Sequence, residues 1–291
     1  MFNRFIVATD LSPASSAMTD CLKGLKDFGA GDCLLLQCLS FSHAASTAYS
    51  YKTESLDELM EKQKKNLEEQ GFNVETRIVV GSAKREINRI AVKENYDLIV
   101  LGAQGHSLAE EKIIGGVAFG VINKTEKPVL VVPVEKSGED SACLPFENCG
   151  FSEHVLFATD FSEMADNAFN SLKQLVAEGV KKLTLIHVQD KVKLEQHLKD
   201  RLEEFNEHDR GRLADLRKTL LKKSPSLQVN TEVCYGITHE EICRLIKEHD
   251  AKMAVMGTQG RGFVREIFLG SVSHNVVRNS PVPVLLIPMR N

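Results

Sequence analysis

The stretch Val155-Leu-Phe-Ala-Thr-Asp-Phe-Ser162 decides the fold, because a close copy, Phe5-Ile-Val-Ala-Thr-Asp-Leu-Ser12, precedes it in the chain. The copies lie 150 residues apart, from Asp10 to Asp160. Each is a short apolar run closed by Thr-Asp, which is typical of a strand buried on both faces. The repeat predicts a duplicated domain.

Later landmarks repeat in the same order. Val100-Leu-Gly-Ala-Gln-Gly105 matches Val255-Met-Gly-Thr-Gln-Gly260, and Pro128–Pro133 matches Pro283–Pro288, both at 155 residues. The offset changes once, from 150 to 155 residues, so one connection differs in length and the chain is not a short-period solenoid.

The length of 291 residues suits two domains. The stretch between the copies begins with polar residues and has no periodicity, as linkers do. We therefore expect a first domain over 1–135, a linker over 136–150 and a second domain over 151–291.

Within each half, β-rich apolar runs alternate with helical stretches, which predicts a doubly wound α/β fold with parallel sheets. Leu156-Phe157 and Leu185-Ile186 are the expected centre of one core. The expected strands are Phe5–Thr9, Cys33–Leu39, Val74–Val80, Leu98–Leu101 and Val129–Val132, then Val155–Thr159, Leu183–Val188, Val229–Tyr235, Met253–Met256 and Val284–Ile287.

Two helical patterns stand out in the second half. Thr238 with Glu241 predicts a capping box that opens a helix burying Ile242, Leu245 and Ile246. One apolar helical stripe contains Leu198, Leu202, Phe205, Leu213, Leu216 and Leu220.

Composition narrows the function classes. Hydrophobic residues make up 43% and charged residues 26%, and the net charge is −4, so no basic face for DNA or RNA is indicated. No apolar run reaches membrane-spanning length, and the N-terminus has no signal-peptide pattern, so we expect a cytoplasmic protein. The seven cysteines include no CxxC pair, and we expect reduced, buried thiols.

The chemistry is expected beyond the carboxyl ends of the strands, where ligands bind in open parallel sheets. Asp10 and Asp160 follow the first strand of each half, and a G-x-x-G follows the fourth. If these strands are neighbours, both signatures face one crevice.

The second G-x-x-G continues into a phosphate cradle. Gly270 closes a loop that Gly260 opens, and a helix is expected to begin at Ser271 with free N–H groups. The hydroxyls of Ser271 and Ser273 add donors, and Arg261 either supplies a positive charge or is solvated.

Other nucleotide and metal motifs are missing from the sequence. There is no G-x-x-x-x-G-K-[ST], no G-x-G-x-x-G after the first strand, and no H-E-x-x-H or paired Cys/His spacing. His187 closes an apolar strand and is interpreted as a packed residue lining the site rather than a catalyst. No metal ligands are expected.

The sequence resembles the universal stress protein family over nearly its whole length, twice. The family's G-x2-G-x9-G-[S/T] is matched in full by Gly257, Gly260, Gly270 and Ser271. The resemblance implies five-stranded parallel sheets of order 3-2-1-4-5, as in adenine nucleotide alpha hydrolase-like folds. It also implies ATP or AMP as ligand, with Mg²⁺ accompanying ATP.

Residue roles follow from the resemblance. Asp160 would contact the ribose or base, Val188 and Met256 would flank adenine, and the glycines and serines would hold ribose and phosphates. The candidate nucleotide-binding set is Ala158, Thr159, Asp160, His187, Val188, Met256, Gly257, Gly260, Arg261, Gly270, Ser271, Val272 and Ser273.

The first half departs from the pattern. Gly116 and Ala118 stand where the family pattern has hydroxyls, and Glu110 and Glu111 bring negative charge. Each lost hydrogen bond to a charged phosphate costs about 1.5–3 kcal/mol. The half is either a weaker site or only a loop that keeps the fold; its candidate residues are Ala8, Asp10, Leu39, Leu101, Gly102, Gly105, Gly115, Gly116 and Val117.

Three functions stay open. The first is a nucleotide-responsive regulatory module of the stress response that acts on an unidentified protein partner. The second is a slow ATPase or self-phosphorylating enzyme, and the third is a nucleotide-independent partner-binding scaffold. In the family, final strands pair between subunits, so a pseudo-dimeric monomer or a homodimer is expected, without membrane or nucleic-acid partners.

Overall fold

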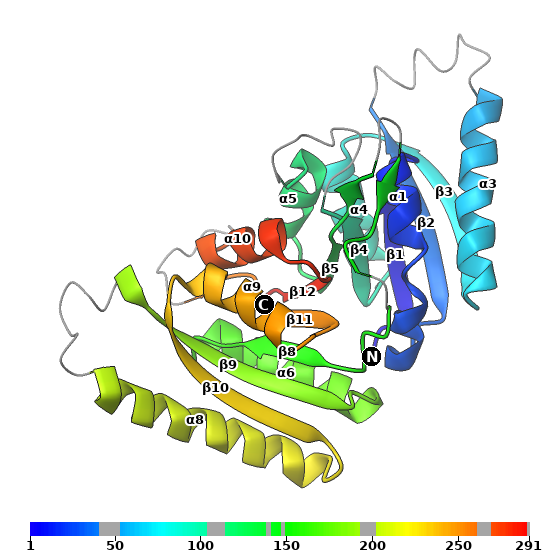
Figure 1. The fold of residues 1–291 in the computed structure, drawn as a ribbon. Coiled ribbons are helices and arrows are strands. Elements are labelled where there is room, and N and C mark those ends of the chain that lie inside the picture. The colour runs from blue at the N-terminus through cyan, green and yellow to red at the C-terminus, as the bar shows by residue number, and fades with distance from the viewer. Residues whose placement is uncertain are drawn as a thin grey trace. The chain divides into compact units, whose positions relative to one another are not determined.

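The computed structural model describes residues 1–40, 53–103, 114–137, 141–146, 149–192, 202–260 and 269–289. The chain divides into two units, Met1–Cys149 and Gly150–Asn291. Each unit contains a five-stranded parallel sheet with helices on both faces (Figure 1). This is the doubly wound α/β architecture that the alternating pattern predicts.

The first unit orders its strands β5-β4-β1-β2-β3, which confirms the order 3-2-1-4-5. Its strands are β1 (Arg4–Thr9), β2 (Asp32–Leu39), β3 (Asn73–Val80), β4 (Leu98–Gly102) and β5 (Val129–Val132). Its helices are α1 (Pro13–Thr19), α3 (Thr53–Glu69), α4 (Ala83–Lys93), α5 (Gly116–Ile122) and a 3-10 helix over Lys23–Phe28.

The second unit repeats this order as β12-β11-β8-β9-β10. Its strands are β8 (Val155–Ala158), β9 (Lys182–Asp190), β10 (Gln228–Gly236), β11 (Met253–Gly257) and β12 (Val284–Ile287). Its helices are α6 (Glu163–Glu178), α8 (Leu202–Lys223), α9 (Thr238–Glu248) and α10 (Ser271–Asn279).

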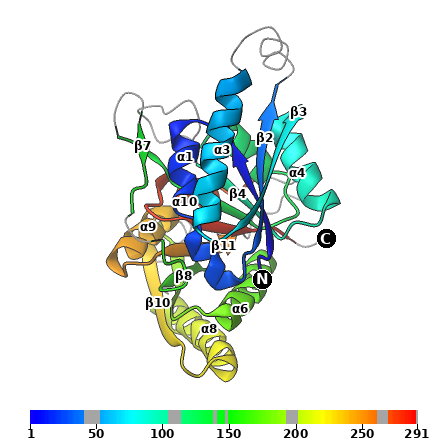
Figure 2. The ribbon, with the colours of Figure 1, turned by 90° about the vertical axis from the view of Figure 1, so that its right-hand side faces the viewer.

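Apolar side chains on both faces of the central strands form the core of each unit. In the second unit Leu156, Phe157, Leu185 and Ile186 are fully buried, as predicted. Helices α6 and α8 cover one face of that sheet and α9 covers the other, with α8 lying along β9 and β10 (Figure 1). In the first unit α1 and α3 cover one face and α4 the other (Figure 2).

Two helix predictions have different outcomes. The capping box at Thr238 is wrong, because Ile237 is the N-cap of α9 and makes no side-chain cap hydrogen bond. The burial of Ile242, Leu245 and Ile246 is confirmed. Of the predicted α8 stripe, Leu213 and Leu220 are fully buried, and Leu198 lies outside the described residues.

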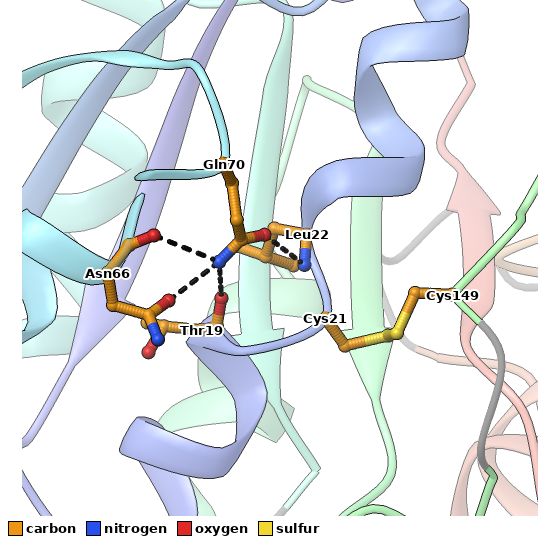
Figure 3. Close-up of a disulfide and its surroundings, with 6 residues drawn as sticks. All are labelled: Thr19, Cys21, Leu22, Asn66, Gln70 and Cys149. Carbon is orange, nitrogen blue, oxygen red and sulfur yellow. Dashed lines mark hydrogen bonds between the residues drawn. A yellow bond between two sulfur atoms is a disulfide. The ribbon is translucent and has the colours of Figure 1, made fainter. Parts of the chain in front are cut away.

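The cysteines correct a prediction. Cys21, just after α1, forms a disulfide with Cys149, the last residue of the first unit (Figure 3). Cys143 is exposed, so the expectation of uniformly reduced, buried thiols is wrong. No local pattern indicates this pairing, since the two cysteines are 128 residues apart and only the fold brings them together.

The segment before Cys149 contains a short hairpin. A short antiparallel hairpin pairs β6 (Glu135–Lys136) with β7 (Ala142–Cys143). Ser137 N–H donates to the Ser141 carbonyl oxygen at 3.0 Å, which closes the hairpin.

Candidate functional site

A cavity of about 680 Å³ lies at the carboxyl ends of β8, β9 and β11 in the second unit. This is where open α/β sheets place their ligands. Its walls come from the loop after β8, the last residues of β9, the glycine loop after β11, and helices α8, α9 and α10. The volume falls within the range of small-molecule and cofactor pockets.

The loop after β8 holds Asp160 in one orientation. Oδ1 of Asp160 accepts hydrogen bonds from the Ser162 N–H at 3.0 Å and the Ser162 hydroxyl at 2.6 Å. Phe161 has a left-handed φ of 58°, and its N–H donates to the Thr159 hydroxyl at 3.0 Å. A tight turn therefore presents the carboxylate at the cavity.

The glycine loop after β11 closes on itself. Gly270 N–H donates to the Thr258 carbonyl oxygen at 2.8 Å. A Cβ atom at Gly257 would lie 3.1 Å from the Gln259 carbonyl oxygen, and one at Gly270 would lie 3.3 Å from Gln259 Cα. Both glycines are thus required by backbone packing as well as by access for a ligand.

Helix α10 begins at Ser271, as predicted, with Gly270 as its N-cap. Its first-turn N–H groups have no intrahelical partners and carry the positive end of the helix dipole. The two serines differ. Ser271 is exposed, whereas Ser273 is 3% exposed and its hydroxyl donates to the Gly257 carbonyl oxygen at 2.9 Å. Ser273 therefore braces the loop, whereas Ser271 lies in the cavity wall and is exposed to solvent.

Helix α8 supplies a wall that sequence reasoning missed. Asp209 is 9% exposed, and its Oδ2 lies 3.4 Å from His187 Nε2 and 3.1 Å from Gln189 Nε2. His187 Nδ1 donates to the Thr159 carbonyl oxygen at 2.7 Å. The buried carboxylate thus links α8 to the ends of β8 and β9.

Arg212 joins this cluster by stacking. Its guanidinium lies 3.8 Å from the centre of the Phe161 ring, and that ring lies 4.7 Å from the His187 ring. A signal was available in the sequence. Asp209 falls between Phe205 and Leu213 on the apolar stripe of α8, and a charged residue inside such a stripe is unusual unless it is paired.

Most predicted residues of the second half line this one cavity. Arg261 lies outside the described residues. The predicted residues in the walls are Ala158, Thr159, Asp160, His187, Val188, Met256, Gly257, Gly260, Gly270, Ser271, Val272 and Ser273. The wall residues that sequence reasoning did not name include Gln189, Phe205, His208, Asp209, Arg212, Thr238, Ile242 and Gln259.

The first unit has a smaller cavity of about 380 Å³ at the corresponding strand ends. Asp10 Oδ1 accepts from the Ser12 N–H at 3.1 Å and from the Ser12 hydroxyl at 2.5 Å, which repeats the Asp160 turn. Predicted residues in its walls are Ala8, Asp10, Leu101, Gly102, Gly115, Gly116 and Val117, and Gly105, Glu110 and Glu111 lie outside the described residues.

The prediction that Leu39 lines this cavity differs from the structure, in which the neighbouring Cys38 takes that place. Cys38 lines the cavity, whereas Leu39 is not among its walls. The strand pairings place Ala8 opposite Leu36 and the equivalent Ala158 opposite Ile186, so Cys38 corresponds to Val188. A one-residue error moves a side chain to the other face of the sheet. Burial, with a smaller effect of Glu86, raises the pKa of the Cys38 thiol to about 11.

The described ranges contain neither a candidate metal-ion site nor a membrane-spanning helix. No group of three or more His, Cys, Asp or Glu side chains there is placed to hold a metal ion. No helix in those ranges is both long and apolar enough to cross a membrane.

The geometry defines a class of protein: paired doubly wound α/β units, each with a cavity at the carboxyl ends of its strands. The chain belongs to the universal stress protein family, whose profile matches residues 1–133 and 152–288 and so gives two such domains.

Known proteins are similar to this chain over one or both of its domains. A universal stress protein structure from Archaeoglobus fulgidus has a TM-score of 0.70 at 24% identity, over 98% of this chain and 96% of that one. Universal stress protein MJ0577 from Methanocaldococcus jannaschii is 27% identical over 154 residues, which is 47% of this chain and 95% of that protein. Another universal stress protein was solved in complex with cAMP; it is 20% identical, with a TM-score of 0.35, over 46% of this chain and 98% of that one.

Proposed function

We propose that the second unit binds an adenine nucleotide, ATP or AMP, and that the bound nucleotide controls association with a protein partner in the cytoplasm. One observation carries the proposal: Asp160, the glycine loop and the first turn of α10 surround a single cavity. Bare N–H groups at a helix N-terminus favour a phosphate, and glycines allow its close approach.

The rest of the cavity suits a nucleoside. Val188 and Met256 provide buried apolar surface for a base, and Asp160 provides an acceptor for ribose hydroxyls. Arg212 brings a cationic side chain to the loop after β8, where its Nη2 donates to the Phe161 carbonyl oxygen at 3.4 Å. Mg²⁺ would accompany ATP and offset part of its phosphate charge.

The test is isothermal titration of nucleotide-stripped protein with ATP, ADP and AMP. We expect binding to the second unit, weakened about tenfold or more by Ser271→Ala, because a hydrogen bond to a charged group contributes about 1.5–3 kcal/mol. Ser226→Ala, at an exposed position outside the cavity walls, is the matched control. The proposal fails if the stripped protein binds none of the three.

The same samples address turnover. Steady release of ADP or phosphate, lost in Asp160→Ala while ATP affinity is kept, would favour the slow ATPase over the binding module. Loss of affinity in Asp160→Ala is the result that the binding module predicts.

A further inference from the structure

Gln189 presents an unusual group at the cavity wall. It lines the cavity and is 5% exposed, and its Nε2 donates to Asp209 Oδ2 at 3.1 Å. Within the described part of the chain, its Oε1 is buried without a hydrogen-bond partner. Such groups are rare in folded proteins and call for an explanation.

The orientation of this amide follows from chemistry. A carboxylate only accepts hydrogen bonds, so the amide nitrogen must face Asp209 and the oxygen must face away. Asp209 Oδ2 also lies 3.4 Å from His187 Nε2, and Asp209 Oδ1 lies 3.9 Å from Arg212 Nη1. The cluster therefore supplies a positioned acceptor that lacks a donor, which costs about 1–3 kcal/mol unless a ligand provides one.

The topology places this acceptor opposite the phosphate end of the cavity. Gln189 is at the end of β9, the glycine loop follows β11, and β8 lies between these strands. Two strand spacings amount to about 10 Å. A nucleotide whose phosphate lies at α10 thus extends its base across β8 towards Gln189.

We propose that Gln189 recognises the 6-amino group of adenine and makes the site select adenine over 6-oxo purines. This inference rests on the proposed function. Adenine carries an amine donor at position 6, whereas guanine has an oxygen acceptor there. The 6-oxygen of a 6-oxo purine would face Gln189 Oε1, and neither oxygen could donate a hydrogen bond to the other. Sites built to form a hydrogen bond strongly reject analogues that cannot form it.

The cavity of the first unit lacks this feature, because the described buried amide oxygens of that unit without a hydrogen-bond partner, Gln37 Oε1 and Asn88 Oδ1, belong to residues outside the cavity walls. The strand pairings place Leu39 at the position that corresponds to Gln189, and its side chain offers no acceptor. A nucleotide bound in the first unit should therefore show no preference at position 6, and the preference is specific to the second.

The experiment compares Kd for ATP and for ITP, which carries oxygen at position 6. We expect wild-type protein to bind ATP at least tenfold more tightly, and Gln189→Met to bring the ratio close to one, mainly through lost ATP affinity. Gln189→Leu is a second variant that tests the same role if Gln189→Met does not fold. Gln228→Leu, at the exposed start of β10, is the matched control.

The outcomes separate the two claims. Equal wild-type binding of ATP and ITP, or an unchanged ratio in both folded Gln189 variants, overturns the role of Gln189 and leaves nucleotide binding standing. Failure to bind any nucleotide refutes the proposed function itself. Asp209→Asn should lower the preference for ATP over ITP without abolishing ATP binding. An asparagine side chain both donates and accepts hydrogen bonds, so the Gln189 amide can rotate and exchange its oxygen and nitrogen.

A second inference comes from the disulfide. Figure 3 shows that Gln70, the residue after α3, holds the turn containing Cys21 from the other side: Gln70 Nε2 donates to the Thr19 carbonyl oxygen at 2.7 Å, and Leu22 N–H donates to Gln70 Oε1 at 3.1 Å. Cys21 is thus positioned whether or not the bond exists.

Cys149 is attached differently. In the described ranges 141–146 and 149, the hydrogen bonds run to the β6 side of the hairpin, through Ser137 and the β6–β7 pairing, and β7 packs against α1. The disulfide is the covalent attachment of this end of the segment to the body of the unit.

We infer that Cys21–Cys149 is a reversible redox-modification site that fastens the end of the segment at Cys149 to the turn after α1. A small thiol such as glutathione attacks one sulfur, releases the other as a thiolate that takes up a proton, and a second thiol completes the two-electron reduction. The products are two cysteine thiols and one oxidised glutathione.

Hydrogen exchange of the full chain in oxidised and reduced glutathione tests this. We expect exchange of 141–149 to rise severalfold on reduction, while the Leu22 amide stays protected by Gln70. Cys149→Ser should match the reduced protein in either buffer, and Cys143→Ser should respond as wild type does. Equal exchange in both states, or alkylation showing Cys21 and Cys149 free in oxidised glutathione, would overturn the inference.

Discussion

Gly260 faces Asp160 so closely that no larger residue fits between them: a Cβ atom at Gly260 would lie 2.5 Å from Asp160 Oδ2, which is closer than real Cβ atoms approach an oxygen. The glycine signature after β11 and the aspartate after β8 are thus parts of one structure. Ser162 holds the other carboxylate oxygen, so Asp160 has little freedom to move aside.

Gly260→Ala should therefore weaken nucleotide binding about tenfold or more with little change in Tm, since Gly260 is exposed. The added methyl group displaces Asp160 from its turn. Titration with ATP measures the loss. Gly211→Ala, on α8, is the matched control because a Cβ there meets no atom within 4 Å. If Gly260→Ala binds ATP with wild-type affinity, the position of the Asp160 carboxylate does not matter for nucleotide binding.

Ser273→Ala should act on stability rather than directly on phosphate binding. It leaves the buried Gly257 carbonyl oxygen without its side-chain donor, at a cost of about 1 kcal/mol. Thermal unfolding of the ligand-free protein should show a lower Tm, whereas Ser271→Ala should not. An unchanged Tm in Ser273→Ala would show that this hydrogen bond contributes nothing to the loop.

Restoring hydroxyls should strengthen the first unit. A Cβ at Gly116 meets no atom within 4 Å, so serine fits there, and Ala118 occupies the place of Ser273. Gly116→Ser with Ala118→Ser, made in a Ser271→Ala background, should raise ATP affinity at this site about tenfold. Gly116→Ala with Ala118→Ser lacks the outward hydroxyl and serves as control; equal affinities in the two would argue against the hydroxyl at position 116.

His154 should make the second unit sensitive to acid. Burial, followed by the charge of Lys182, lowers its pKa from 6.5 to about 4. The unfolded chain takes up this proton below pH 6.5 but the folded chain only near pH 4, so stability falls as pH drops through this window. The loss is at most about 3 kcal/mol, at about 1.4 kcal/mol per pKa unit.

Denaturant unfolding from pH 7.5 to 4.5 measures this dependence. His154→Asn removes the titrating ring and retains a polar group near the Thr184 hydroxyl, which lies 2.9 Å from His154 Nε2. The variant should have a flatter stability profile than wild type. Parallel profiles would assign the acid sensitivity to other groups.

Local signals in the sequence predicted much of the fold and part of the candidate site. Apolar runs set the strands because a parallel strand must be buried on both faces. Glycine spacing set the loop after β11 and the start of α10, because only glycine permits such close backbone approach. The repeat then placed both signatures at equivalent strand ends in each unit.

Contacts between distant segments were decided only by tertiary structure. The wall formed by Asp209, Arg212 and Gln189 requires α8 to pack beside β9, and no local pattern states which residue of a helix meets which residue of a strand. Register made Cys38 rather than Leu39 the cavity residue, because successive side chains face opposite ways. The Cys21–Cys149 bond likewise depends on two ends of the first unit meeting in space, which spacing along the chain does not encode.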